Sequence, residues 1–304
     1  MSPFCLGGNV FGWGADEDAS HAVLDAYVKA GGNFVDTADV YSAWVPGNRG
    51  GESETILGRW LADDGNRGRV VVATKVGWEA EGHPSGLGRD QIRRGVEASL
   101  DRLGVDRIDV YFAHKDDPST PLDETARALS ELVEEGLVRA LGASNYSAER
   151  LGELLAITER EGLARFDVLQ PNYSLMERRE YEGALQDAAL DAGMGVTPYF
   201  SLARGFLTGK YRPGEPIPES VRAGGVASQY LNDRGFGVLA ALDRVAEAHD
   251  ASPAQVALAW LAAQPGVVAP IASATSVAHV EDLAGSMDLT LDEEHLAALS
   301  AASA

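Results

Sequence analysis

Short β-branched runs alternate along the chain with amphipathic stretches of helical length. This alternation predicts βαβ units, whose strands form a parallel sheet. The expected strands are residues 4–6, 33–35, 70–73, 109–112, 138–143, 166–169, 195–198 and 267–271. The expected helices are residues 19–30, 52–61, 90–103, 122–135, 148–161, 179–191 and 253–263.

Eight parallel strands with right-handed crossovers close most economically into a (β/α)8 TIM barrel. An open doubly wound sheet has the same local pattern. Residues 7–12 follow the first strand and are glycine-rich, but they lack the GxGxxG spacing, which weighs against the open sheet. We therefore expect one barrel domain over residues 1–304.

An additional helical pattern at residues 237–249 precedes the last strand, where a plain barrel needs only the helix at 253–263. Residues 213–235 before it contain several prolines and glycines, which predicts a long connection without regular structure. Such a connection is usually a lid or a binding loop, and a disordered segment is the alternative interpretation.

Composition narrows the setting of this barrel. A chain of 304 residues with 45% hydrophobic content can bury one substantial core. Cys5 is the only cysteine, so no intramolecular disulfide forms, and the six histidines lack metal-binding spacings such as HxxEH. We expect no metal site and a cytoplasmic location. The sequence has no signal-peptide pattern and no run of eighteen apolar residues, so we expect neither export nor a membrane span.

The charge is strongly acidic, with 46 acidic against 25 basic residues and a formal net charge of −21. Such a chain repels polyanions, so we expect no nucleic-acid partner. Any anionic ligand has to be held by a local site. The helical patterns show no clear apolar interface, and the oligomeric state stays open.

Four polar residues follow strand-like runs: Asp36, Tyr41, Lys75 and His114. In a barrel these positions lie at the carboxyl ends of the strands, where such folds carry their chemistry. Taken singly, Asp36 and Lys75 could form a structural ion pair, Tyr41 could be a loop aromatic, and His114 a buried histidine. Their shared edge favours a functional interpretation.

Several motifs around these residues resemble the aldo-keto reductases, from about residue 6 to about residue 299. They are Asn-Phe-Val-Asp-Thr-Ala-Asp-Val-Tyr at 33–41, the helix start at 51–58, Ala-Thr-Lys at 73–75, Ala-His at 113–114, Leu-Gly-Ala-Ser-Asn-Tyr-Ser at 141–147 and Gln-Pro-Asn-Tyr at 170–173. The sequence is similar to bacterial-type members, near the general stress, sugar-reductase and potassium-channel β-subunit branches. The resemblance implies NAD(P)H-dependent reduction of an aldehyde, ketone or sugar-like carbonyl.

Carbonyl reduction by hydride transfer leaves an alkoxide that has to be protonated. Tyr41 is the best available acid, and the charge of Lys75 is expected to make its phenol, with an ordinary pKa near 10, give up the proton more readily. Asp36 would pair with Lys75, and His114 would orient the carbonyl oxygen. These four residues are the expected catalytic set.

The resemblance also implies a cofactor site in the second half of the chain. Ser144, Asn145 and Gln170 match residues that bind the nicotinamide amide, and Tyr199 matches an aromatic that stacks on the nicotinamide ring. The segment with Leu202, Gly205 and Lys210 resembles the one along the pyrophosphate. The full expected set is Gly8, Asn9, Asp36, Ser144, Asn145, Gln170, Tyr199, Phe200, Leu202, Gly205, Lys210, Ser273, Thr275, Ser276, His279 and Asp282.

The sequence departs from the family pattern in two parts of this site. Phe200 and Ser201 replace the usual small hydroxyl residue and proline after the stacking aromatic, which puts the local chain path in doubt. Residues 273–279 contain no arginine or lysine for a 2′-phosphate. Hydroxyls and a helix start there could hold a phosphate, and Glu281 and Asp282 oppose it. We favour NADP(H), with NAD(H) as the alternative.

Three of the five tryptophans, Trp13, Trp44 and Trp78, fall in loops at the expected active face. Together with Tyr41 and His114 they predict an aromatic pocket for a small or medium organic carbonyl or alcohol. A cofactor-sensing subunit with little turnover is an alternative function. A hydrolytic barrel needs paired carboxylates or a metal at the strand ends, and neither is visible.

Family members usually begin with a hairpin that closes the barrel floor, and this sequence starts almost at the first strand. We expect either a floor that is covered differently or a sequence that starts late. The floor lies opposite the active face, so this departure bears on stability more than on chemistry.

Overall fold

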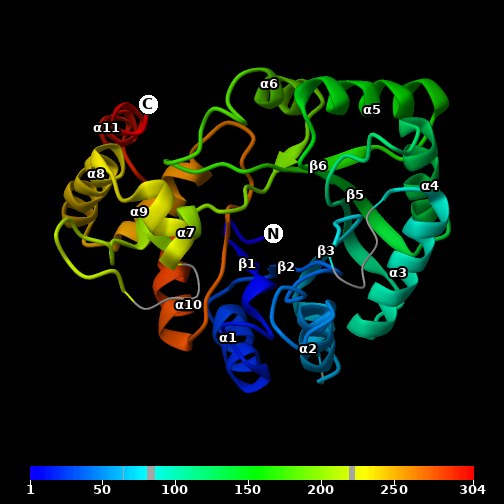
Figure 1. Ribbon diagram of the computed structural model, residues 1–304, viewed down its shortest axis with the longest axis horizontal. Coiled ribbons are helices and arrows are strands. Elements are labelled where there is room, and N and C mark those ends of the chain that lie inside the picture. Colours follow the sequence, from blue (N-terminus) through cyan, green and yellow to red (C-terminus); the bar gives the residue numbers. More distant parts are fainter. Residues whose placement is uncertain (64, 81–85, 219–222) are drawn as a thin grey trace.

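The computed structural model describes residues 1–63, 65–80, 86–218 and 223–304. Its parallel strands form one sheet in the order β7-β6-β5-β4-β3-β2-β1-β8. The strands are β1 Cys5–Gly7, β2 Phe34–Asp36, β3 Val71–Val76, β4 Ile108–Ala113, β5 Val138–Ser144, β6 Phe166–Gln170, β7 Gly195–Val196 and β8 Ile271–Ala272. The strands lie at the centre and the helices surround them (Figure 1).

The helices follow the predicted alternation with the strands. They are α1 Glu17–Lys29, α2 Glu52–Leu61, α3 Arg89–Leu103, α4 Leu122–Glu134, α5 Ala148–Glu161, α6 Ala184–Asp191, α7 Ala223–Tyr230, α8 Asp233–His249, α9 Pro253–Ala262, α10 Val277–Ala284 and α11 Glu293–Ala302. Capping residues define several helix starts, as at α9, where Ser252 before Pro253 and Gln255 after it form a capping box.

The ring of strands closes between β7 and the segment that leads into β8. Val196 forms a parallel bridge with Val267, and the Val268 amide donates to the Val196 carbonyl at 2.9 Å. The Ile271 amide donates to the Pro198 carbonyl, also at 2.9 Å. These bonds close the sheet into the predicted (β/α)8 barrel and exclude the open doubly wound sheet.

The eighth strand is shorter and later than the predicted 267–271. Regular strand covers only Ile271–Ala272, which pair with Cys5 and Leu6 of β1. Pro270 lacks an amide hydrogen and cannot donate to a ladder, so regular pairing begins after it. The residues before Pro270 instead make the closing contacts with β7.

Two hydrophobic cores are present among the described residues, one inside the barrel and a larger one between the strands and the helices. The buried residues of the inner core are Cys5, Phe34, Ala73, Val110, Phe112, Val168, Ala269 and Ile271. The Phe112 ring occupies the space beside Gly142, where an added Cβ would lie 2.3 Å from the ring. The interior is therefore a packed support for the residues at the strand ends.

The predicted irregular connection at residues 213–235 is wrong in part. Helix α7 lies within it, α8 begins at Asp233 rather than at 237, and residues 219–222 lie outside the described ranges. The Asn232 side chain accepts from the Gly235 amide at 2.9 Å and caps α8. Val226 and Tyr230 of α7 are buried, and this tertiary packing overrides the local glycines.

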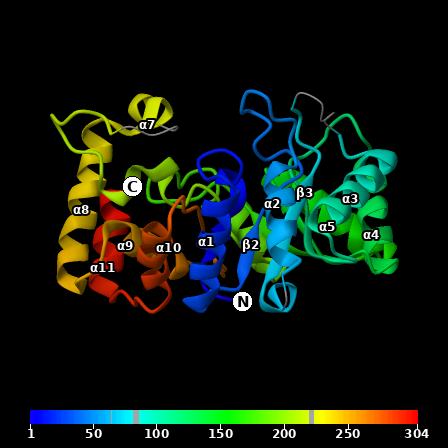
Figure 2. The ribbon, with the colours of Figure 1, turned by 90° about the horizontal axis from the view of Figure 1, so that it is seen from below.

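The loops that carry the site lie on one side of the barrel. Figure 2 shows the loop after β2 and helix α7 on this side, and the N-terminus on the opposite side. Parallel strands place all their carboxyl ends on the same side, so residues distant in sequence meet there.

Helices α2 and α3 pack closely against each other at Gly58. A Cβ added at Gly58 of α2 would lie 2.1 Å from the Arg102 carbonyl oxygen, which is backbone and cannot turn away. We expect Gly58→Ala to lower the free energy of unfolding by about 1–3 kcal/mol, measured by chemical denaturation.

Gly152→Ala in α5 is the matched control for this helix-interior change. No atom beyond the neighbouring backbone of α5 itself lies within 4 Å of the added Cβ there, so the substitution should stabilise the protein by about 0.5–1 kcal/mol. Equal stability of the two variants would contradict the packing described here.

Candidate active site

The Lys75 ammonium is the centre of a buried network at the carboxyl end of β3. Its Nζ lies 2.7 Å from Asp36 Oδ2 and donates at 2.7 Å to the Thr37 carbonyl and at 2.8 Å to Tyr41 Oη. The Lys75 side chain is fully buried and the Asp36 side chain is 3% exposed. β2 and β3 are neighbours in the sheet, so the end of one strand meets the end of the next.

Asp36 connects this network to the far side of the barrel mouth. Gln170, the last residue of β6, donates from Nε2 to Asp36 Oδ1 at 2.9 Å. Tyr41 Oη is 3.3 Å from the other carboxylate oxygen of Asp36. The two oxygens of one carboxylate thereby hold a lysine, a tyrosine and a glutamine from three parts of the chain.

The environment shifts the acid–base properties of Tyr41 and Lys75. Burial, followed by the Asp36 carboxylate, raises the pKa of the Tyr41 phenol well above its usual value. Burial lowers the pKa of Lys75, and Asp36 opposes that shift. The Tyr41 phenol is therefore less acidic than a free tyrosine in this structure, contrary to the expectation, and burial and the Asp36 carboxylate are the largest causes. The Tyr41 phenol therefore keeps its proton in this environment.

His114, directly after β4, completes the set of four predicted strand-end residues. It is buried, and its Nδ1 has no hydrogen-bond partner among the residues described. Burial, then Lys75 and Lys115, hold the pKa of His114 well below its usual value, so the imidazole is neutral. Its ring centroid lies 6.0 Å from that of Tyr41 and 5.0 Å from that of Trp78.

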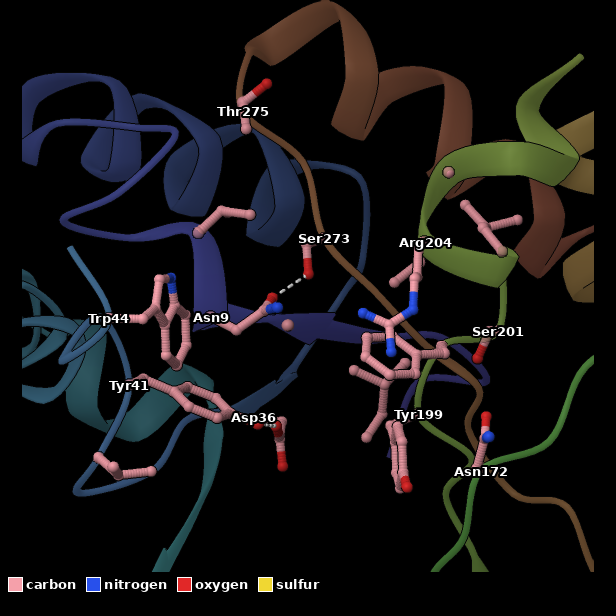
Figure 3. A pocket seen from close by; sticks show the side chains of 18 of the residues that line it. Asn9, Asp36, Tyr41, Trp44, Asn172, Tyr199, Ser201, Arg204, Ser273 and Thr275 are labelled. Carbon is pink, nitrogen blue, oxygen red and sulfur yellow. Dashed lines mark hydrogen bonds between the residues drawn. The ribbon is translucent and has the colours of Figure 1, made fainter. Parts of the chain in front are cut away.

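A pocket with a cavity volume of about 1380 Å³ opens over these residues. Of the predicted catalytic residues, Asp36, Tyr41 and His114 line it, and Lys75 lies behind them. Figure 3 shows Tyr41 and Trp44 on one side of the pocket and Tyr199 and Arg204 on the other. The predicted cofactor and substrate residues that also line it are Asn9, Trp44, Trp78, Ser144, Asn145, Gln170, Tyr199, Phe200, Leu202, Gly205, Lys210, Ser273, Thr275, His279 and Asp282.

Three of the predicted cofactor and substrate residues lie outside the pocket lining. Gly8 packs under it, and a Cβ there would lie 3.1 Å from the Asp36 carbonyl oxygen. Trp13 packs edge-to-face against Trp44, with the ring centroids 5.5 Å apart. Ser276 caps α10 by accepting from the backbone amide of His279. Each of these residues contacts a pocket residue rather than facing the cavity.

Hydrogen bonds link the strand ends into one wall of the pocket. Tyr199 Oη donates to Asn145 Oδ1 at 2.7 Å, and Asn145 Nδ2 donates to the His114 carbonyl at 2.8 Å. Ser144 Oγ donates to the Gln170 carbonyl at 2.8 Å. Asn145 itself has a left-handed φ of 57°, a conformation that asparagine tolerates. The wall therefore joins β4, β5 and β6 to the residues after β7.

Several residues that line the pocket were not among the predicted site residues: Asn172, Glu180, Arg204 and Thr208. Arg204 is the most consequential, because its guanidinium lies 4.1 Å from the centroid of the Phe200 ring. A basic residue beside the expected pyrophosphate segment was the available signal. One hydrogen bond, from Ser273 Oγ to Asn9 Oδ1, joins the segments that follow the neighbouring strands β8 and β1 (Figure 3).

The doubtful chain path after Tyr199 is strained. Phe200, Ala203 and Arg204 have left-handed φ values of 53°, 46° and 58°. Such conformations cost about 1 kcal/mol or more per non-glycine residue, and they persist only where the surroundings impose them. The Ala203 amide donates to the Phe200 carbonyl at 2.6 Å, which fixes the turn at the pocket edge.

Comparison with known proteins connects this geometry to a family. The model of the Aldo/keto reductase family matches residues 3–304. The chain belongs to the aldo/keto reductase family. A probable voltage-gated potassium channel subunit beta from Oryza sativa subsp. japonica is 35% identical, with 87% of this chain and 80% of the relative covered. Aldo-keto reductase str7 from Strobilurus tenacellus is 33% identical (93% and 80% covered). Aldo-keto reductase yakc [NADP(+)] from Schizosaccharomyces pombe is 29% identical (95% and 84%).

Membership of the aldo/keto reductase family supports an oxidoreductase that uses a nicotinamide cofactor and acts on small carbonyl compounds. None of the helices in the described ranges has the length and apolarity that a bilayer crossing requires. Which cofactor this aldo/keto reductase prefers is a separate question from its family.

Behind the lysine of this aldo/keto reductase lies a second buried acidic group. The Asp39 amide donates to the Lys75 carbonyl at 3.2 Å, and Asp39 Oδ1 has no hydrogen-bond partner in the described part of the chain. Glu54 nearby accepts from Thr74 Oγ1 at 2.5 Å and from Arg102 Nε at 2.6 Å. Burial, then Glu54, raises the pKa of Asp39 to about 8.

This shift predicts the pH dependence of stability. From about pH 4 to about pH 8 the folded protein keeps a proton on Asp39 that the unfolded chain releases, so the free energy of unfolding falls as pH rises. Asp39→Asn removes this loss, and its advantage over wild type should grow by at most about 1.4 kcal/mol per pH unit. Chemical denaturation at a series of pH values measures the difference.

Asp288→Asn, at an exposed aspartate, is the control and should follow the wild-type pH profile. A constant offset between Asp39→Asn and wild type over this range would show that Asp39 is already ionised in the folded protein.

Proposed function

We propose that this protein is an NAD(P)H-dependent aldo-keto reductase that reduces a small aldehyde, ketone or sugar-like carbonyl. The observation that carries the proposal is the Tyr41 phenol, which lines the pocket and is held at 2.8 Å from the buried Lys75 ammonium. The single cysteine, buried Cys5, is compatible with a reducing compartment such as the cytoplasm.

In the proposed reaction the bound cofactor supplies a hydride to the carbonyl carbon. Tyr41 gives its proton to the carbonyl oxygen as negative charge develops there. The Lys75 ammonium beside Tyr41 Oη then stabilises the phenolate that remains, and Asp36 holds Lys75 in place. Neutral His114 lines the same pocket and can donate a hydrogen bond that orients the carbonyl.

The pocket fits a nicotinamide dinucleotide in its donors and charges. Tyr199 offers an aromatic ring at the barrel mouth, and Ser144, Asn145 and Gln170 offer polar groups beside it. Arg204 Nε is buried and lacks a hydrogen-bond partner within the described residues, which favours an anionic group against this segment. Lys210 lines the pocket beyond Gly205, where a Cβ would approach its Nζ to 3.8 Å.

The substrate end of the pocket is aromatic. Trp44 and Trp78 line it and are 49% and 40% exposed, which leaves their faces open to a ligand. Two indoles close to Tyr41 and His114 suit a small or medium organic carbonyl, with few polar groups for it to satisfy.

Replacing the proposed acid tests the mechanism. Tyr41→Phe removes the proton donor and keeps the ring, so kcat for carbonyl reduction should fall by about 10²- to 10⁴-fold. The measurement is steady-state NADPH consumption with a panel of aldehydes, ketones and sugars. Tyr146→Phe is the control, because Tyr146 is also buried, has no hydroxyl partner among described residues and lies outside the pocket lining. Near-native turnover by folded Tyr41→Phe would reject Tyr41 as the acid.

A second candidate is a cofactor-sensing subunit with little turnover. It is favoured by the similarity to the rice protein named as a probable potassium channel β-subunit. The same panel separates the two, since a sensor would bind NADPH, seen as a change in cofactor fluorescence, without measurable turnover of any compound.

For the cofactor we favour NADP(H) over NAD(H). The relative from Schizosaccharomyces pombe carries NADP(+) in its name. Arg204 adds a positive charge to the lining of the pocket. Thr275 and His279 supply hydrogen-bonding side chains after β8, while the Asp282 carboxylate opposes a phosphate. We expect kcat/KM to be higher with NADPH than with NADH, and equal or better use of NADH would reverse this preference.

A further inference from the structure

Two helices far from the pocket bring three metal-binding side chains together. His249 is the last residue of α8, and Asp292 and His295 lie at the start of α11. His249 Nε2 is 3.0 Å from His295 Nδ1, which is also 3.0 Å from Asp292 Oδ2. α8 and α11 lie side by side in both ribbon views (Figures 1 and 2). Within the described ranges this is the one group of three or more histidine, cysteine or carboxylate residues with converging donor atoms.

The two contacts of His295 Nδ1 conflict in the absence of another partner. One hydrogen on this nitrogen can align with the Asp292 carboxylate or with His249 Nε2, not with both. Without that hydrogen, His249 can donate to the Nδ1 lone pair, but Nδ1 and Asp292 Oδ2 are then two acceptors 3.0 Å apart with no hydrogen between them. Each tautomer therefore leaves one close contact unfavourable. A cation removes the conflict, because it accepts lone pairs from all three groups.

The spacing of the three groups matches a small coordination sphere. The ligand atoms lie within 4.8 Å of one another, with two separations of 3.0 Å. Around a tetrahedral zinc ion with bonds of about 2.0–2.1 Å, neighbouring ligand atoms are about 3.3 Å apart. Small shifts at two helix ends would suffice to reach that spacing.

We propose that His249, Asp292 and His295 form a binding site for Zn²⁺ or a related late first-row divalent ion. Two imidazoles and one carboxylate suit such ions, whereas Mg²⁺ and Ca²⁺ prefer oxygen ligands throughout. The Asp292 side chain is 58% exposed and that of His295 is 28% exposed, so the ion can enter and keep a water ligand. The net charge of −21 favours a cation.

The end of α8 and the start of α11 position the three side chains of this site. The Asp292 side chain also caps α11 through the His295 amide, at 2.8 Å from Oδ1 to N, which leaves Oδ2 turned toward His295 Nδ1. This cap orients the carboxylate before any metal binds. The ion would link the end of α8 to the start of α11. Its role would be structural, because none of its three ligands lines the pocket.

The sequence analysis expected no metal site, because the histidines lack a short motif spacing. His249 and His295 come from helices separated by α9, β8 and α10, and only the fold brings them together. The Asp292-Glu293-Glu294-His295 stretch was the available signal, since residues three apart share a helix face.

Isothermal titration of the protein, without a histidine tag, with ZnCl₂ at pH 7.5 tests the site. One equivalent should bind, and at zinc concentrations about 100 times the Kd the melting temperature should rise by about 5 °C. His249→Gln and His295→Ala should each weaken zinc binding by more than about 100-fold, since even outer-shell partners contribute about 10- to 100-fold.

Asp292→Asn separates metal binding from folding, because its amide oxygen can still cap α11 while the charge is lost. It should weaken zinc binding with an unchanged circular dichroism spectrum. His21→Gln, at a half-buried histidine on α1, is the control and should bind zinc as wild type does. Unchanged zinc affinity in His295→Ala, or equal stabilisation by MgCl₂ and ZnCl₂, would overturn the proposal.

Discussion

The buried ammonium of Lys75 is the constraint on which this end of the barrel depends. A lysine ammonium has three hydrogens, and each has an acceptor here: Asp36, the Thr37 carbonyl and Tyr41. An uncompensated charge at this depth would be costly, so all three acceptors are needed. The path of the chain after β2 and the position of the Tyr41 phenol are therefore consequences of one buried charge.

The same constraint reaches across the barrel mouth. Asp36 also binds Gln170 at the end of β6, and the Ser144 hydroxyl of β5 holds the Gln170 carbonyl. Side chains proposed to act in catalysis and in cofactor binding are thus parts of one hydrogen-bonded layer on top of the packed interior. A substitution at one of these side chains therefore removes a hydrogen bond that positions its neighbours in the layer.

The sequence predicted the regular parts of the fold and the meeting of the four strand-end residues, because strand periodicity and parallel topology determine both. It did not predict helix α7, whose buried Tyr230 depends on tertiary contacts, or the short β8, which Pro270 delays. The direction of the Tyr41 pKa depends on how burial competes with neighbouring charges, which no motif encodes. Arg204 escaped prediction because its place in the pocket results from a left-handed turn.

The lengths of the strands make this barrel uneven. β3, β4 and β5 have six, six and seven residues, whereas β7 and β8 have two each. The long strands carry Lys75 and Ser144 and lead into His114, and the short ones border the strained turn that holds Arg204. Local opening takes least free energy where few backbone hydrogen bonds have to break. Backbone pairing is therefore most extensive beneath Lys75, Ser144 and His114, and the seam between β7 and β8 is where local opening should take the least free energy.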